Sequence, residues 1–338
     1  MERKLSPTYL LSPTRARSGG YTLVELLIAL ALMAVLYVGI GGVASQALQT
    51  HDIVSEHNEL TRQARFAMEQ MVRAVSRSPH LLLPLADKTV TTFVENIREE
   101  KYPASTPPPG SVFATAVLAV TQDPAVDLDG NGSPDADNDA DDRIDEDLPA
   151  DVSNDGKPGI MDIDDDGNGV KDFSFSPVAD DDESVDLAQN EDPFNGIDDD
   201  GDGITDEDPG ADNNGDGCAG VCNVDDDADG NLDEGAVADD DEDGRSDEDW
   251  YDPVVFYLDN GTLMQRIPVP WDANGSGSVT GSDFVAEPIA ENVIRFRVER
   301  LPPKGNRPIL VDLTLELQSP DSNETVSLHH RVRVGGAL

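Results

Sequence analysis

The chain has few of the residues that build catalytic or zinc centres. Of its 338 residues five are histidine and two are cysteine, and the histidines are scattered along the sequence. No serine nucleophile elbow, phosphate-binding loop or CxxC redox pair occurs. Zinc requires cysteine or histidine ligands in a cluster, so a zinc site is not expected. On these absences the chain is not expected to be an enzyme.

Positive charge is also scarce. The chain has 23 lysines and arginines against 69 acidic residues, a formal net charge of −46. The imbalance is local, because residues 121–250 hold 48 acidic and four basic residues and carry a net charge of about −44. Nucleic acid is not an expected partner of this segment, because the phosphate backbone would be repelled.

The acidic segment, residues 127–250, differs in composition from both of its flanks. It is poor in aromatic and β-branched residues, so unaided it cannot bury enough apolar surface to offset its chain entropy and should be disordered. Residues 79–126 and 251–338 instead carry apolar runs typical of strands, with turn signals between them. We therefore expect an acidic insert within one β-rich globular domain.

The N-terminal sequence SGGYTLVELLIALALMAVL places Gly20 just ahead of an apolar run whose only charge is Glu25. A carboxylate at the start of a membrane-spanning helix is costly without a partner. Cleavage after Gly20 would supply one, the free amine of Tyr21. Residues 26–45 are uncharged and, at about 1.5 Å per residue, long enough to span a bilayer. A single-pass membrane protein is expected.

This N-terminus resembles the type IV prepilins, with a basic leader, a glycine at the cut, an aromatic residue, Thr-Leu-Val and a glutamate before an apolar helix. The resemblance implies a leader of residues 1–20, removed by prepilin peptidase, methylation of the Tyr21 amine, and pairing of Glu25 with an N-terminus during assembly. Tyr21 departs from the commoner phenylalanine or methionine. A secretory signal peptide and an uncut anchor are the alternatives, and neither explains the diglycine together with Glu25.

Apolar residues continue beyond the membrane stretch at spacings of mostly three, four and seven, as far as Val75. This spacing predicts one helix over residues 21–78, because Pro79 cannot continue it. Its first half would lie in the membrane or a filament core, and its second half would pack on the globular domain.

Strands are predicted over residues 112–121, 289–299, 309–317 and 326–334, with a hairpin over 253–269 that turns at Asn260-Gly261. The order predicts an α+β fold, a long N-terminal helix packed on an antiparallel sheet. This layout is similar to that of PilW-like minor pilins and of the J-type pseudopilins of type II secretion, which implies a pilin-like fold outside the insert.

The insert repeats a pattern of oxygen-bearing side chains at positions 1, 3, 5 and 9 with glycine at position 6. Alternating oxygens on a tight loop suit calcium, which takes six to eight hard oxygen ligands. The repeats resemble thrombospondin type 3 calcium repeats and the loop half of an EF-hand or dockerin, which implies calcium binding. Copies that start at Asp137 and Asp212 are degenerate. The full copies supply Asp127, Asp129, Asn131 and Asp135; Asp164, Asp166, Asn168 and Asp172; Asp198, Asp200, Asp202 and Asp206; Asp225, Asp227, Asp229 and Asp233; and Asp239, Asp241, Asp243 and Asp247.

A further calcium candidate lies in the folded part, where Asp272, Asn274, Ser276 and Asp283 match an EF-hand-like loop of twelve residues. Asn-Gly-Ser-Gly is also ordinary turn chemistry, so a plain turn is the alternative there. For the insert, the alternative is a solvated, disordered spacer. The two cysteines, Cys218 and Cys222, are expected to form a local disulfide, since they lack further cysteine or histidine ligands nearby.

The sequence thus favours a minor pilin or pseudopilin subunit of a type IV pilus or type II secretion filament, displaying a calcium-stabilised module. Its expected partners are prepilin peptidase and other pilins or pseudopilins, and its expected location is the bacterial inner membrane, then the filament. The alternative is a calcium-dependent adhesin at the filament tip. Location along the fibre, and surface binding with and without calcium, would discriminate the two.

Overall fold

The computed structural model divides into two compact units, Met1–Ser55 and Glu56–Leu338. The side chains of residues 38–50, 52 and 94 lie outside the description. The residues that the structure describes are 22–85, 89–94, 116–139, 143–145, 148–165, 171–172, 176, 178–181, 210–212, 217–219, 222–223, 231–232, 235–239, 245–246, 248–301, 309–320 and 322–336.

The single helix among the described residues, α1 (Leu23–Arg77), agrees with the predicted helix to within two residues at each end. It stops two residues before Pro79, which has no backbone N–H to donate. The described large apolar side chains from Leu23 to Tyr37 are exposed. Within the described residues, no helix combines the length and apolarity that a membrane crossing requires. The expected span runs past Tyr37 into side chains that are not described.

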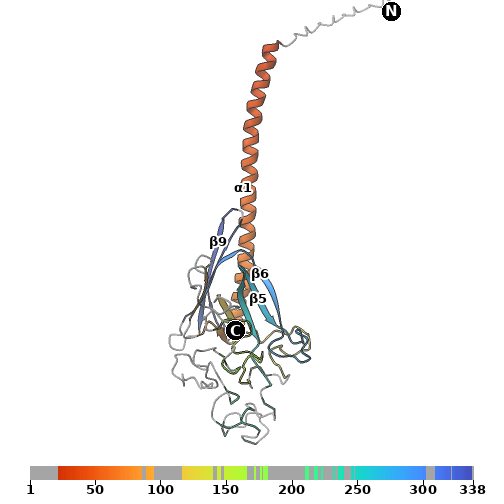
Figure 1. The fold of residues 1–338 in the computed structure, drawn as a ribbon, viewed down its shortest axis with the longest axis vertical. Helices are drawn as coiled ribbons and strands as arrows, with labels where there is room; N and C mark the ends of the chain where they lie inside the picture. Colours follow the sequence, from red (N-terminus) through yellow and green to blue (C-terminus); the bar gives the residue numbers. More distant parts are fainter. Residues whose placement is uncertain are drawn as a thin grey trace, which may run out of the picture. The chain divides into compact units, whose positions relative to one another are not determined.

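The globular unit contains two antiparallel sheets where the sequence predicted one. The five-stranded sheet has the order β1-β3-β4-β5-β6, and the four-stranded sheet has the order β2-β7-β8-β9. Several of these strands surround the end of α1 in Figure 1. The strands are β1 (Leu81–Leu83), β2 (Val90–Val94), β3 (Val117–Thr121), β4 (Pro253–Asp259), β5 (Thr262–Pro268), β6 (Phe284–Ala290), β7 (Val293–Leu301), β8 (Leu310–Gln318) and β9 (Thr325–Arg333).

The second sheet arises because the run predicted as one strand, residues 289–299, is broken. Between β6 and β7 the chain turns at Glu291-Asn292, where Asn292 has a φ of 58°. Asparagine tolerates this left-handed conformation better than most residues. The chain passes there from one sheet to the other, so the single-strand prediction was wrong at its start.

The other strand predictions fare better. The hairpin of β4 and β5 turns at Asn260 and Gly261 with φ values of 48° and 77°, as a two-residue hairpin loop requires. Strands β8 and β9 match the predicted runs 309–317 and 326–334, and β3 lies within 112–121, of which residues 112–115 are outside the description. The short strands β1 and β2 and most of β6 were not predicted.

The main core lies between α1 and the two sheets. Helix residues Ala64, Ala67, Met71 and Val75 are fully buried, so the predicted apolar stripe does pack on the globular domain. They meet aromatic and branched side chains from both sheets, including Phe256 and Phe296. This face of α1 holds the sheets together.

A second apolar cluster covers the opposite face of the five-stranded sheet. Ile160 and Ile163, from the acidic insert, pack with Val117, Ala119 and Val255 of β3 and β4. All five residues of β3 are therefore buried, as expected of a strand with both faces covered. Composition alone predicted disorder for the unaided insert; in the structure two of its residues, Ile160 and Ile163, pack on the sheet.

Candidate functional site

The N-terminus of α1 places Glu25 beside Thr22. Glu25 Oε2 accepts hydrogen bonds from the backbone nitrogen of Thr22 at 2.9 Å and from its hydroxyl at 3.0 Å, and Thr22 Oγ1 accepts from the nitrogen of Glu25 at 3.3 Å. This is a capping box, in which two unsatisfied helix donors are paired reciprocally. Glu25 therefore has a partner within its own subunit, which the sequence analysis did not foresee although Thr-x-x-Glu is the signature.

The first repeat folds into a tight loop around Asp127. Its carboxylate accepts the backbone N–H groups of Asn131 at 3.1 Å and Gly132 at 3.2 Å, and Asp135 turns back to accept the N–H of Leu128 at 2.9 Å. Oxygens of Asp127, Asp129 and Asp135 lie within 4.8 Å of one another, which is close enough to share one ion. The structure thus brings together three of the predicted ligands.

The loop at Asp272 in the β5–β6 connection has the same hydrogen-bond pattern. Asp272 accepts the N–H groups of Ser276 at 2.9 Å and Gly277 at 2.9 Å. Asp283, at the twelfth position, is buried and accepts the N–H of Asn274 at 3.0 Å. The carboxylate of Asp283 thus closes a loop that begins eleven residues earlier, at Asp272.

The remaining predicted ligands are only partly described. Asp164 and Asp239 are buried, and Asp172 accepts the N–H of Asp162 at 2.7 Å. In the degenerate copy, Gly217 donates to Asp212 at 3.0 Å, and Cys218 and Cys222 nearby form a disulfide. The following predicted residues lie outside the described ones: Gly20, Tyr21, Asp166, Asn168, Asp198, Asp200, Asp202, Asp206, Asp225, Asp227, Asp229, Asp233, Asp241, Asp243 and Asp247.

Another loop of this kind, at residues 151–156, was missed by the sequence analysis. Asp151 accepts the N–H of Gly156 at 2.9 Å, five residues on, as Asp127 does in the first repeat. Ser153 and Asp155 occupy the third and fifth positions and Gly156 the sixth, but position 9 is Gly159, which has no side-chain oxygen. The serine and the missing ninth ligand hid the loop.

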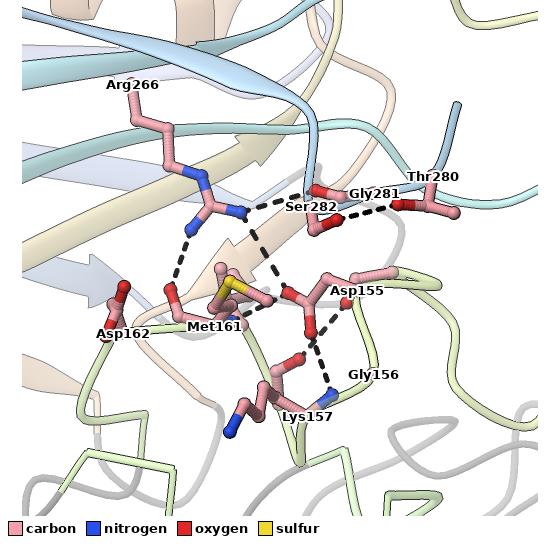
Figure 2. A network of polar contacts seen from close by, with 12 residues as sticks. Asp155, Gly156, Lys157, Met161, Asp162, Arg266, Thr280, Gly281 and Ser282 are labelled. Carbon is pink, nitrogen blue, oxygen red and sulfur yellow. Dashed lines mark hydrogen bonds and ion pairs between the residues drawn. The ribbon is translucent and has the colours of Figure 1, made fainter. Parts of the chain in front are cut away.

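This loop is held by Arg266 of β5, as Figure 2 shows. The guanidinium donates to the carbonyl oxygen of Met161 at 2.7 Å and lies 3.9 Å from a carboxylate oxygen of Asp155. Both charged side chains are buried. The guanidinium also stacks 3.6 Å above the ring of Phe284. The arginine therefore supplies the positive charge that this loop needs.

Loop 151–156 also packs against the Asp272 loop region. Gly281 donates its N–H to the carbonyl oxygen of Asn154 at 3.0 Å. A Cβ at Gly281 would lie 1.6 Å from the carbonyl oxygen of Ser153, so no other residue fits without a shift of the backbone. The insert and the β5–β6 connection are in direct contact here.

The electrostatics of the two insert loops differ. Burial raises the pKa of Asp155 to about 7, although the N–H of Met161 and the charge of Arg266 act against this rise. Burial also raises the pKa of Asp135, and the carboxylates of Asp129 and Asp127 raise it further. No basic residue among the described ones offsets this effect at Asp135. The first repeat therefore lacks the cation that Arg266 provides elsewhere.

Residues 15–40 match the family model of the prokaryotic N-terminal methylation motif. The N-terminus is type IV prepilin-like. The motif implies processing by a prepilin peptidase and assembly with other pilins. Comparison with curated proteins and with solved structures gave no match. The matched motif covers the start of α1 and none of the globular unit.

The Arg266–Asp155 pair gives a prediction for stability. Arg266→Met leaves the Asp155 charge buried and unpaired, which should lower the free energy of unfolding by about 3–5 kcal/mol near pH 8. Because the folded pKa of Asp155 lies above its unfolded value of about 4, its contribution to stability falls as pH rises from about 4 to about 7. The loss should therefore be smaller near pH 5, where Asp155 is protonated. Urea unfolding of the full chain, in detergent with chelator, measures the loss in the free energy of unfolding at each pH.

The matched controls separate this pair from surface pairs. Arg297→Met, which breaks a half-exposed pair with Glu299 at 2.8 Å, should cost less than about 1 kcal/mol. Combining Arg266→Met with Asp155→Leu should recover much of the loss, because a pair of apolar residues can replace a buried ion pair. An equal loss for Arg266→Met at both pH values would contradict the assigned role of Asp155.

Proposed function

We propose that the chain is a minor pilin or pseudopilin subunit, cut after Gly20 and assembled through α1 into a type IV pilus or type II secretion filament. The precursor is anchored in the inner membrane. The carrying observation is the methylation motif at residues 15–40. The exposed apolar side chains from Leu23 to Tyr37 support it, because such a surface in a soluble monomer is unusual and suits a bilayer or a filament core.

We further propose that the insert is a calcium-stabilised module. The loops at Asp127 and Asp272 already aim carboxylates inward around backbone N–H groups, with glycine at the sixth position. Five ions, one per full repeat, would offset about 10 of the insert's roughly 44 net negative charges, which is enough to stabilise local loops. Extracellular calcium modules commonly bind at about 10⁻⁴ to 10⁻³ M, which suits folding after export. A calcium-dependent tip adhesin remains the alternative use of the same module.

The N-terminus gives a prediction that separates two roles of Glu25. In filaments the chain should begin at a methylated Tyr21, as read by mass spectrometry, and Gly20→Leu should leave it uncut. Glu25→Ala should be processed but assemble poorly, because it removes both the capping box and the charge. Glu25→Gln keeps a side chain that can form the capping box but has no charge to pair with an amine.

If Glu25 pairs with an N-terminal amine, Glu25→Gln should assemble as poorly as Glu25→Ala. Filament incorporation of Glu25→Gln at the wild-type level would show that the helix cap is sufficient and would remove the pairing role. A mature terminus near residue 45, or an intact Met1 in filaments, would contradict the prepilin assignment itself.

Calcium binding is tested by calorimetric titration of the full chain in detergent. Several sites of submillimolar to millimolar affinity are expected, about 10⁻⁴ to 10⁻³ M. Changing Asp127 and Asp129 together to Asn should remove one site, because both charges leave one loop. The control, Glu287→Gln with Glu291→Gln, removes two exposed carboxylates, one in β6 and one in the turn after it, and should remove no calcium site. Absence of measurable binding would return the insert to a solvated acidic spacer.

A further inference from the structure

The two ends of the insert meet at a small cavity beside the five-stranded sheet. Gln122 follows β3 and Asp252 precedes β4, and the N–H of Gln122 donates to the carbonyl oxygen of Asp252 at 2.9 Å. The cavity has a volume of about 10 Å³ and is lined by Gln122, Asp135, Asn138, Trp250 and Asp252, with proline and valine side chains from residues 268–279. It has room for one sphere the size of a water molecule.

Gln122 is the feature that points to a ligand. Its side chain is buried, with the residue 4% exposed, and its Oε1 has no hydrogen-bond donor among the described residues. A buried amide oxygen without a partner costs about 1–3 kcal/mol, so such atoms are normally satisfied by protein, water or an ion. No repeat of the insert includes this residue.

The cavity is lined by two acidic side chains. Asp135 and Asp252 are both buried, and none of the residues that line the cavity is basic. Asn138 Nδ2 donates to Asp252 at 3.2 Å and to Asp249 at 2.8 Å, which fixes both carboxylates near the cavity.

A water molecule and a cation are the two candidates for this space. Trp250 Nε1 is also buried and has no acceptor among the described residues, and a water molecule could accept from it and donate to Gln122. A neutral water would bring no positive charge to the two acidic side chains. A hard cation bound by one amide oxygen and two carboxylates would supply it, and these are the ligands that calcium prefers.

We propose that this cavity binds one calcium ion through Gln122 Oε1 and the carboxylates of Asp135 and Asp252, so that the ion ties both ends of the insert to β3 and β4. The proposal rests on the proposed calcium module in one respect, since Asp135 also belongs to the first repeat. Gln122 and Asp252 belong to no repeat, which makes this site separable from the loops by mutation.

Terbium, a luminescent substitute for calcium, tests the site because its emission is sensitised by a nearby indole. The chain has two tryptophans, Trp250 in the cavity and the half-exposed Trp271 beside the Asp272 loop. The full chain carrying Trp271→Phe is titrated with terbium in detergent and excited where tyrosine does not absorb. We expect sensitised emission, and added calcium should displace the terbium and reduce the emission.

Variants then assign the emission to the cavity. Gln122→Leu and Asp252→Asn should each weaken terbium binding at least about tenfold, whereas Gln122→Glu, which keeps an oxygen ligand, should retain it. Asp129→Asn, which affects only the first repeat, should leave the emission in place. Folding of the Gln122→Leu chain is checked in a version that carries Trp250→Phe and keeps Trp271. Terbium emission sensitised by Trp271 should persist in this chain.

An emission curve unchanged by Gln122→Leu and Asp252→Asn would overturn the proposal and leave a water molecule in the cavity. Loss of the emission with Asp129→Asn but not with Gln122→Leu would also overturn it, since the signal would then come from the first repeat. Failure of the proposed calcium module gives a different result. The calorimetric calcium titration would then be unchanged when Asp127→Asn and Asp129→Asn are introduced together.

Discussion

Compensation of carboxylate charge is the constraint on which the insert's structure depends. At residues 151–156 the compensation comes from the protein itself, because the Arg266 guanidinium lies 3.9 Å from Asp155 and donates to the carbonyl oxygen of Met161. This lets Ile160 and Ile163 reach the outer face of the five-stranded sheet. At Asp135, in the first repeat, no basic residue among the described ones offsets the nearby carboxylates. The same loop chemistry therefore has two solutions, an arginine where the loop packs on the sheet and, in our proposal, calcium where it does not.

The β domain and the insert depend on each other through this arrangement. Strand β3 is buried at all five positions, with α1 on one side and insert residues on the other. The contact between Gly281 and Asn154 joins the insert to the β5–β6 connection. An insert that covers a sheet face in this way is part of the domain's packing as well as a displayed module, and a filament subunit would carry it as a fixed attachment.

Local patterns in the sequence were sufficient for α1, for the β4–β5 hairpin and for the tight loops, because each depends on residues a few positions apart. The break between β6 and β7 was missed because Asn292 only marks a turn when both flanking runs are recognised as separate strands. The loop at Asp151 was missed because Ser153 and Gly159 depart from the repeat pattern. Its partner Arg266 was missed because it lies more than 100 residues away, and only the fold brings the two together. The uninterrupted apolar run of β3 was the one available signal that both sheet faces are covered.

Hydrogen exchange of the insert amides tests this account most directly. The N–H groups of Asn131 and Gly132 donate to Asp127, and those of Lys157 and Met161 donate to Asp155. We expect calcium to slow exchange at Asn131 and Gly132 strongly, and chelation to restore it, because the ion holds Asp127 in place. Exchange at Lys157 and Met161 should be slow in both conditions, because Arg266 holds Asp155. Equal exchange with and without calcium at all four amides, or an equal response at all four, would contradict the account.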